Sequence, residues 1–442
     1  MVMTGKIRSA VGIVVLWVAS THCTSKSNDA DAKKPVNIKT IQSDKAYLAS
    51  SSATDEEIAS RAKNNNEFAF ALYSKLVGGE SDNFLISPLS IQSAFALLFP
   101  GSANAAEAEL SQALRFKLPQ VKFHDSMKGL MLRYLSLGKS LAPGTNFEIN
   151  ITNDVWLDEG IELQAGYLDT IKTAYNAGVN SLDFAGHAEN SRQTINDYIA
   201  TRTKDRITDL LPPGQVTALT KIVLTNAISF LADWKFPFEK RSTVADDNFT
   251  TVSGEKTTVA MMNQVGSFSY YESASYQAVS LPYADPGIAM MIVLPKPSSD
   301  LSKVEAGLDA TEWDKIVKGS AVANVALSLP KFSFKSGTRS LKKEFEQMGL
   351  HSVFQASPDN FPKLINSKPP TDLYIQDIFH KTFVRVDEKG TEAAAATAII
   401  IGTLGMPPAE GRKTFRVDHP AMFFLYEAKT GAIAFIGHLV RP

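Results

Sequence analysis

The sequence predicts an α+β fold in a single domain that begins near residue 54. Helical apolar periodicity dominates the first half of the chain, whereas runs of β-branched and aromatic residues dominate the later part. No internal repeat and no clear composition break divides the 442-residue chain after residue 54. The composition, 44% hydrophobic and 21% charged, is ordinary for a globular protein with a well-packed core. Helices that precede strands, with little alternation between them, favour the α+β class.

The first 23 residues have the pattern of a signal peptide. Lys6 and Arg8 precede an apolar run, Ala10–Ala19, that is too short to span a bilayer. The chain's one cysteine, Cys23, follows directly. Cys23 is a candidate lipidation site that would tether the protein to a membrane, as in bacterial lipoproteins. The alternative is that Cys23 lies beside an ordinary cleavage site. Both interpretations predict an extracellular or cell-envelope location.

Residues 24–53 are expected to form a disordered tether. They are rich in Ser, Lys, Asn, Asp and Ala and contain few large apolar residues. The folded domain is therefore expected to comprise residues 54–442. This domain contains no cysteine, so no intramolecular disulfide can support its fold.

The first helices of the domain are predicted from their caps. Thr54 is followed by three acidic residues, and an apolar face continues to Leu76 before a Gly-Gly pair ends the helix. Ser87 and Pro88 begin a second helix, whose nearly continuous apolar sequence predicts that it is buried. Further helices are expected at 102–114, 164–175, 189–203 and 341–348.

The strands are predicted from short apolar runs. Lys221–Trp234 is a long apolar strand, and residues 421–441 form two strands joined by a Lys-Thr-Gly turn. The remaining strands are expected at 83–86, 150–157, 268–271, 277–281, 289–294, 324–334 and 383–387.

The sequence lacks the motifs of common enzyme classes. There is no G-x-S-x-G elbow, no P-loop and no pair of His residues with metal-ligand spacing, so no catalytic residue, cofactor or metal site is expected. The net charge is −1 and the longest basic clusters are pairs, which argues against a nucleic-acid partner. Several polar residues without an acid-base partner are interpreted as structural hydrogen-bonding groups. They are Ser87, Ser90, Asn226 and His380.

Many ordered blocks of the sequence resemble the serpins, the serine protease inhibitor family. They include "NFLISPLSIQSAFALLFPGS", "VLTNAISFLADW", "LSLPKFSF", "HKTFVRVDEKGTEAAAATA" and "DHPAMFFL". The resemblance extends from about residue 54 to the end of the chain. It implies three β-sheets and eight or nine helices in one domain, with an exposed C-terminal reactive loop. It also implies a monomer without enzyme activity, whose partner is a target serine protease held in a covalent complex.

The resemblance assigns roles to individual positions. Glu388 and Gly390 match the turn at which the reactive loop leaves the central sheet, and Trp234 matches the tryptophan of the breach at the top of that sheet. Counting from Glu388 places the reactive bond between Leu404 and Gly405, with a shift of one or two residues left open. The shutter under the sheet corresponds to Ser87, Ser90, Asn226 and His380. The hinge that inserts after cleavage corresponds to Thr391, Glu392, Ala393, Ala394, Ala395, Ala396 and Thr397.

The composition of the hinge predicts an inhibitor. Alternate side chains of a strand share one face, and the face that begins at Thr391 carries Thr, Ala, Ala and Thr before two isoleucines. Small side chains let a sheet open and close around them, whereas a charged or bulky group would resist burial. Glu392 begins the opposite face, where it can stay hydrated.

The residue at the expected reactive bond indicates the target. Leu404 fits the apolar specificity pocket of chymotrypsin-like or elastase-like serine proteases, and no Arg or Lys suited to trypsin occurs between Gly390 and Glu410. Two alternatives stay open. One is a non-inhibitory serpin that acts as a binding or carrier protein, and the other is an inhibitor of a cysteine protease.

Overall fold

A computed structural model of the protein describes residues 37–77, 82–366, 372–391 and 411–442. The expected signal peptide with Cys23 lies outside the described residues. From Val36 onward the chain forms one compact unit. In this described part, no helix combines the length and apolar character needed to cross a membrane.

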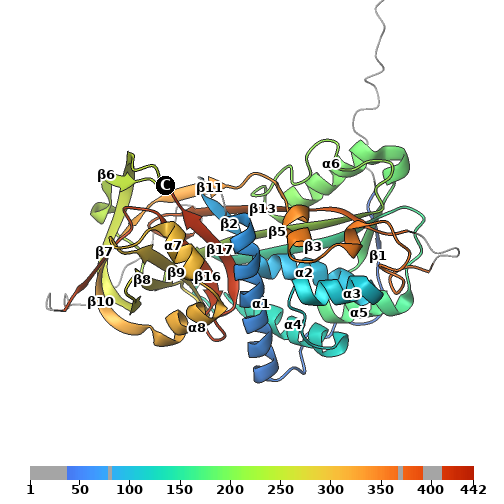
Figure 1. The fold of residues 1–442 in the computed structure, drawn as a ribbon, viewed down its shortest axis with the longest axis horizontal. Coiled ribbons are helices and arrows are strands. Elements are labelled where there is room, and N and C mark those ends of the chain that lie inside the picture. Colours follow the sequence, from blue (N-terminus) through green and yellow to red (C-terminus); the bar gives the residue numbers. More distant parts are fainter. Residues whose placement is uncertain (1–36, 78–81, 367–371, 392–410) are drawn as a thin grey trace, which may run out of the picture. The chain divides into compact units, whose positions relative to one another are not determined.

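Nine α-helices are present among the described residues, which agrees with the expected number. Figure 1 shows how the labelled helices lie around the strands. Thr54 and Glu57 form a capping box at the start of α1, and the Ser87 hydroxyl accepts a hydrogen bond from the Ser90 N–H at the start of α2. Every residue of α2 is buried, because this helix packs against α1 and against strands of both sheets. The helices are α1 Asp55–Leu76, α2 Pro88–Leu98, α3 Asn104–Ala113, α4 Gln120–Ser136, α5 Ala165–Tyr175, α6 Phe184–Arg202, α7 Leu301–Gly307, α8 Ala310–Gly319 and α9 Lys342–Gln347.

One sheet, here called the central sheet, has the strand order β1-β4-β3-β5-β14-β13-β11, with β12 also paired to β13. β5 and β13 run parallel and pair from Ile222 opposite Ile375 to Ile228 opposite Thr382. Beyond this point β14 lies between them. The strands are β1 Lys39–Ile41, β3 Phe147–Asp158, β4 Val179–Leu182, β5 Ile222–Asp233, β11 Phe332–Lys335, β12 Arg339–Ser340, β13 Ile375–Val386 and β14 Gly390–Thr391.

The second sheet has the order β15-β10-β7-β8-β9-β16-β17-β2, with β6 paired to β7. The long strand β7 pairs with β6 and β10 over most of its length and with β8 only at its end. Two sheets of the expected three are therefore joined through β7 into one hydrogen-bonded surface. The strands are β2 Phe84–Ile86, β6 Val244–Thr250, β7 Lys256–Glu272, β8 Tyr276–Pro282, β9 Ile288–Pro295, β10 Ala321–Pro330, β15 Lys413–Arg416, β16 Ala421–Glu427 and β17 Ile433–Leu439.

Several element boundaries differ from the sequence prediction, and the strand expected at 268–271 is only the end of the much longer β7. The strand expected at 324–334 is divided after Pro330, because the chain there leaves β10 in the second sheet and enters β11 in the central sheet. The strand expected at 383–387 begins much earlier, so His380 lies within β13. Helix α6 begins at Phe184, where the Asp183 side chain caps a first turn, but its backbone is kinked at His187, and the helix beyond this kink agrees with the one expected from Glu189.

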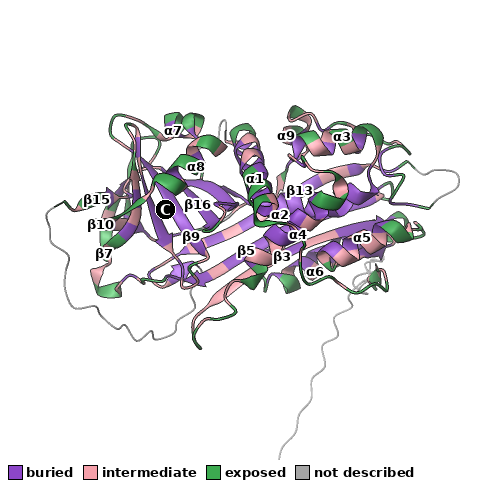
Figure 2. Cartoon of the chain, turned by 90° about the horizontal axis from the view of Figure 1, so that it is seen from below, coloured by how far each residue is buried: buried purple, intermediate pink, exposed green. Residues whose placement is uncertain are grey.

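The two faces of the central sheet pack against different groups of residues. On one face α6 covers an apolar cluster that includes Trp156, Ile195 and Phe379. The other face packs on α2 and joins the main hydrophobic core. Figure 2 shows β5 almost entirely buried and β3 and β13 with both buried and intermediate residues, whereas α3, α5 and α6 expose part of their surface. The contact between β5 and β13 is therefore covered on both sides.

Residues 37–53, here called the strap, are held against the folded body and do not behave as the predicted tether. β1 pairs with the free edge of β4, and the Leu48 N–H donates to the Thr173 carbonyl oxygen of α5 at 3.3 Å. Lys45 forms an ion pair with Asp169 of α5 at 2.8 Å. The strap has few large apolar residues, so its attachment depends on backbone pairing and on polar contacts that composition does not reveal.

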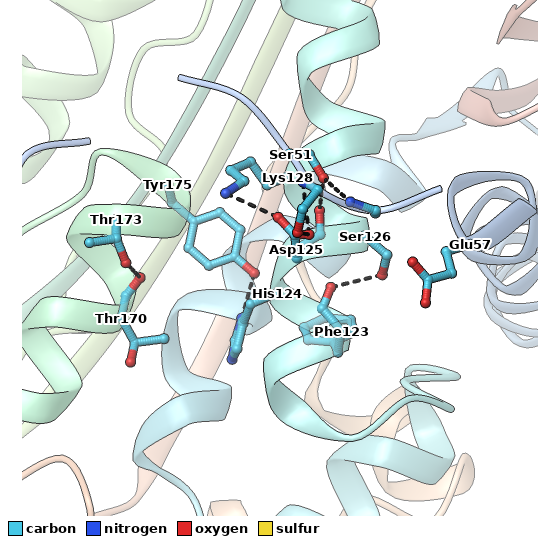
Figure 3. A network of polar contacts seen from close by, with 12 residues as sticks. Ser51, Glu57, Phe123, His124, Asp125, Ser126, Lys128, Thr170, Thr173 and Tyr175 are labelled. Carbon is cyan, nitrogen blue, oxygen red and sulfur yellow. Dashed lines mark hydrogen bonds and ion pairs between the residues drawn. The ribbon is translucent and has the colours of Figure 1, made fainter. Parts of the chain in front are cut away.

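The end of the strap is fastened to α4 (Figure 3). The Ser51 hydroxyl donates to the Asp125 carbonyl oxygen at 2.7 Å, and the Ser52 N–H and hydroxyl donate to the Asp125 carboxylate at 3.0 and 2.6 Å. The same carboxylate pairs with Lys128, whose side chain is only 7% exposed. The strap thus connects α1 to α4, α5 and the outer edge of the central sheet.

Candidate functional site

The expected hinge begins in a tight turn between β13 and β14. The Asp387 carboxylate accepts hydrogen bonds from the N–H groups of Lys389 and Gly390 at 2.9 and 3.3 Å. The Asp387 N–H donates in turn to the Gly390 carbonyl oxygen at 2.9 Å. This side chain closes the turn, so that the chain reverses and re-enters the central sheet.

Gly390 and Thr391 form a two-residue strand inside the sheet. Gly390 lies opposite Asp233 of β5, and Thr391 lies opposite both Ala232 of β5 and Val386 of β13. A Cβ atom on Gly390 would lie 2.0 Å from the Ala232 carbonyl oxygen, so only glycine allows this close backbone approach. Thr391, the first residue of the segment expected to insert, is therefore already a buried strand residue.

Glu388 is anchored close to Trp234, the residue expected at the breach. Its carboxylate pairs with Lys331 at 2.9 Å and accepts a hydrogen bond from the Thr243 hydroxyl at 3.0 Å. Burial acts to raise the pKa of Glu388, but Lys331, a backbone N–H and Thr243 outweigh it, and the pKa lies below its usual value. Glu388 is consequently ionised at neutral pH, and its ion pair contributes stability that is lost as the pH falls through this lowered pKa.

Trp234 connects the turn to the second sheet. Its backbone N–H donates to the Lys389 carbonyl oxygen at 2.8 Å, and its indole N–H donates to the Asp387 carbonyl oxygen at 3.0 Å. The indole stacks on Tyr283, with the ring centres 4.4 Å apart and the planes 14° from parallel. Trp234 thus holds the turn in place through two hydrogen bonds to its backbone carbonyl oxygens.

The four residues expected at the shutter lie together in a buried hydrogen-bonded cluster. The Ser87 N–H donates to His380 Nε2 at 3.1 Å, which leaves His380 Nδ1 as the donor to the Asn226 amide oxygen at 2.7 Å. The Asn226 NH₂ group donates to the Ser90 hydroxyl at 2.5 Å. Burial, with a smaller effect of Arg339, lowers the pKa of His380 to about 3, so the imidazole is neutral at physiological pH. Because Asn226 is in β5 and His380 is in β13, this cluster bridges the two central strands.

Sequence reasoning missed three residues of the site. Asn153 accepts a second hydrogen bond from the Asn226 NH₂ group at 2.6 Å. Lys331 is the partner of Glu388, and Tyr283 packs on Trp234 and contacts Thr391. Each comes from a distant part of the chain, and no local motif marks any of them.

The remaining expected site residues lie outside the described residues. These are the reactive bond Leu404–Gly405 and the hinge segment Glu392, Ala393, Ala394, Ala395, Ala396 and Thr397. Among the residues that the structure describes, no group of three or more His, Cys, Asp or Glu side chains could hold a metal ion.

A cleft of about 700 Å³ opens beside the shutter, between β2 and the β11–β12 connection. Several polar side chains of its lining are bonded to neighbouring residues. The Ser336 hydroxyl contacts Thr382, the Ser340 hydroxyl donates to Asp377, and both nitrogens of His380 are already bonded. The described lining therefore offers no nucleophile with an adjacent base, unlike the active site of a hydrolase.

The sequence and the fold were compared with known proteins. A family model described as "Serpin (serine protease inhibitor)" matches residues 63–442. A serpin-like protein of Methanosarcina mazei is 33% identical over 388 residues, which are 86% of this chain and 87% of that protein. Human antithrombin-III is 31% identical over 393 residues, 88% of this chain and 83% of that protein.

Solved structures with the same fold include a thermophilic serpin and a thyroxine-binding protein. The native state of tengpin, a thermophilic serpin, has a TM-score of 0.79 at 25% identity and covers 92% of this chain and 100% of its own. Human thyroxine-binding globulin, solved with bound thyroxine, has a TM-score of 0.76 at 25% identity and covers 87% of this chain and 99% of its own.

Proposed function

The chain belongs to the serpin family, and we propose that it is a suicide-substrate inhibitor of chymotrypsin-like or elastase-like serine endopeptidases. The observation that carries the proposal is the position of Thr391, a buried strand residue between β5 and β13 at the start of the hinge. A loop that continues from Thr391 can extend an existing strand through the middle of the central sheet.

The observed pairing predicts where each inserted residue would lie. Continuing the antiparallel register of Thr391 with Ala232 and Val386 brings Thr397 between Asn226 and His380. Their mutual hydrogen bond at 2.7 Å would then be exchanged for contacts with the inserted strand. Polar partners at the shutter suit this exchange, because they can bond to each other before insertion and to the new strand afterwards.

The side chains of the hinge suit passage through this buried position. Alternate residues share one face of a strand, and Thr391 is on the buried face. The next residues on that face are Ala393, Ala395 and Thr397. None carries a charge that would have to be desolvated, and none is bulky enough to force the covering helix α2 away.

The proposed reaction uses the catalytic serine of the target protease. Its hydroxyl attacks the Leu404 carbonyl carbon, the Leu404–Gly405 bond breaks, and the new amino terminus at Gly405 leaves with a proton. The acyl-enzyme ester then joins the protease to the freed hinge. Insertion of the hinge carries the protease along before water hydrolyses the ester. The inhibitor supplies no catalytic residue of its own.

The proposal is tested by looking for a covalent complex that survives SDS. The purified protein is incubated with chymotrypsin, elastase, trypsin and, for the cysteine-protease alternative, papain. We expect a stable complex with chymotrypsin or elastase at close to equimolar inhibitor. Cleaved inhibitor without a complex for every protease would overturn the proposal and favour a non-inhibitory binding protein.

A pair of matched variants tests the role of the hinge. Thr391→Arg places a cation in a buried position of the sheet and should convert the inhibitor into a substrate. Thr414→Arg makes the same change at an exposed position of β15 and should leave complex formation intact. Equal inhibition by both variants would show that insertion does not require burial of Thr391.

We also propose that the protein is exported and that Cys23 is its membrane anchor. The proposal rests on the basic and apolar pattern before Cys23 in the sequence. Mass spectrometry of the mature N-terminus tests this proposal: a lipidated Cys23 is expected, and an unmodified N-terminus would reject the anchor.

A further inference from the structure

A pair of buried hydroxyl groups joins the hinge to the second sheet. The hydroxyl groups of Tyr283 and Thr391 share a hydrogen bond of 2.7 Å. The side chain of Tyr283 is fully buried and Thr391 is 1% exposed. Thr391 thus has a specific partner, and this partner comes from outside the two strands that flank it.

The aromatic neighbours of Tyr283 fix its orientation. Its ring stacks on Trp234 and meets Phe230 edge-on, with ring centres 5.0 Å apart. A backbone bridge pairs Tyr283 with Trp234, and the Tyr283 N–H donates to the Ile288 carbonyl oxygen at 3.2 Å. Burial also raises the pKa of Tyr283, so its hydroxyl stays protonated at physiological pH. The hydroxyl therefore has one fixed position from which to bond Thr391.

We propose that Tyr283 is a positioning residue that holds Thr391 between β5 and β13, so that the first step of loop insertion is complete before cleavage. The inference rests on the proposed function, because insertion is the step that it accelerates. Nothing in the sequence marks this role, since the two residues are 108 positions apart.

The advantage of the contact follows from how a strand grows in a sheet. With Thr391 held in place, each further residue adds to an existing strand edge. If Thr391 were not held there, β5 and β13 would have to separate before any loop residue could pair with them. The protease is trapped only if the loop inserts faster than water hydrolyses the acyl-enzyme. A slower first step of insertion therefore favours release of the protease and leaves a cleaved inhibitor.

Tyr283→Phe removes one hydroxyl and leaves the ring stack in place. Thr391 then has a buried hydroxyl without this partner, which favours withdrawal of the hinge from the sheet by about tenfold in population. Tyr426→Phe is a matched control, because the Tyr426 hydroxyl forms a similar buried contact with the Ser280 hydroxyl at 2.9 Å in the second sheet. The control removes the same group at a distance from the hinge.

The first measurement is amide hydrogen exchange of the uncleaved protein, which does not depend on inhibition. We expect exchange in the peptide that contains Gly390 and Thr391 to become about tenfold faster in Tyr283→Phe and to stay unchanged in Tyr426→Phe. Equal exchange in the wild type and Tyr283→Phe would overturn the positioning role. Combining Tyr283→Phe with Thr391→Val removes both hydroxyl groups, and this double variant should restore slow exchange.

The second measurement is the stoichiometry of inhibition with a protease that the wild type traps. We expect Tyr283→Phe to require several times more inhibitor per protease, at an unchanged rate of attack on the loop, and Tyr426→Phe to match the wild type. Fast exchange with an unchanged stoichiometry would overturn the link to insertion. If the wild type traps no protease but the exchange result holds, the proposed function fails and the positioning of Thr391 stands.

Discussion

Asp125→Asn is expected to release the strap and to destabilise the whole domain. The change keeps the shape of the side chain but removes the charge that faces Lys128 and weakens the contacts with Ser52. Burial acts to raise the pKa of Asp125, but Ser52, Lys128 and Ser51 outweigh it and lower the pKa. The carboxylate is thus ionised at pH 7, and its contribution to stability should fade as the pH falls through this lowered pKa.

The magnitude follows from the burial of the two partners. Lys128 is 7% exposed and Asp125 is 22% exposed, with the charged atoms 3.1 Å apart. Removing one partner of a buried ion pair costs about 3–5 kcal/mol, because the other charge is left without compensation. Partial access of water to Asp125 reduces this, and we expect a loss of about 2–3 kcal/mol in the free energy of unfolding. Adding Lys128→Met should recover part of the loss.

Two assays at pH 7 check this prediction. Urea unfolding gives the change in stability, and trypsin cleavage after Lys45 reports on release of the strap. The control is Asp314→Asn in α8, because Asp314 and Lys318 form an exposed pair with 56% and 74% exposed side chains. This control should lose no more than about 0.5 kcal/mol. If both variants behave alike and Lys45 stays protected, the strap does not depend on Asp125.

Further predictions concern the hinge and the response to acid. Gly390→Ala places a Cβ atom 2.0 Å from the Ala232 carbonyl oxygen and should lower the melting temperature, at a cost of about 1–3 kcal/mol; an unchanged melting temperature would contradict the close approach. The pKa values of His380 and His124 are lowered to about 3 by burial, so stability should fall as the pH drops below about 6.5, where the unfolded chain takes up protons that these residues do not. His419 opposes the trend, because the hydrogen bond that its ring N–H donates to the Asp418 carboxylate raises its pKa. Urea midpoints at pH 7 and pH 5 give the net effect, and an equal or higher midpoint at pH 5 would refute the prediction.

Local signals predicted several elements well. The capping residues Thr54 and Ser87 marked the starts of α1 and α2, and the apolar sequence of α2 indicated its burial. Asp309 caps α8 through two backbone N–H groups, and this local pattern in the sequence also indicates a helix start. Helix α4 begins after Pro119 without a side-chain cap. Its start therefore lacks the pattern from which a helix is usually predicted.

Long-range contacts could not be predicted in the same way. The strap is polar, and its order depends on Asp125 and Asp169, which lie far along the chain. The contact of Tyr283 with Thr391 depends on how a turn of the second sheet packs against the central sheet. Spatial proximity of this kind leaves no periodic pattern in one sequence. Only the resemblance to a known family placed Asn226 and His380 together in advance.

The central claim is that the cleaved loop becomes a strand of the central sheet, and comparing the melting temperatures of intact and cleaved protein tests it most directly. The loop is cut between Gly390 and Gly411 by a protease that is not trapped, and both forms are heated under identical conditions. Insertion adds a buried strand between β5 and β13, so the cleaved form should unfold at a clearly higher temperature than the intact form. The Thr391→Arg variant should show a much smaller increase. Equal melting temperatures for intact and cleaved wild-type protein would contradict insertion and, with it, the proposed mechanism of inhibition.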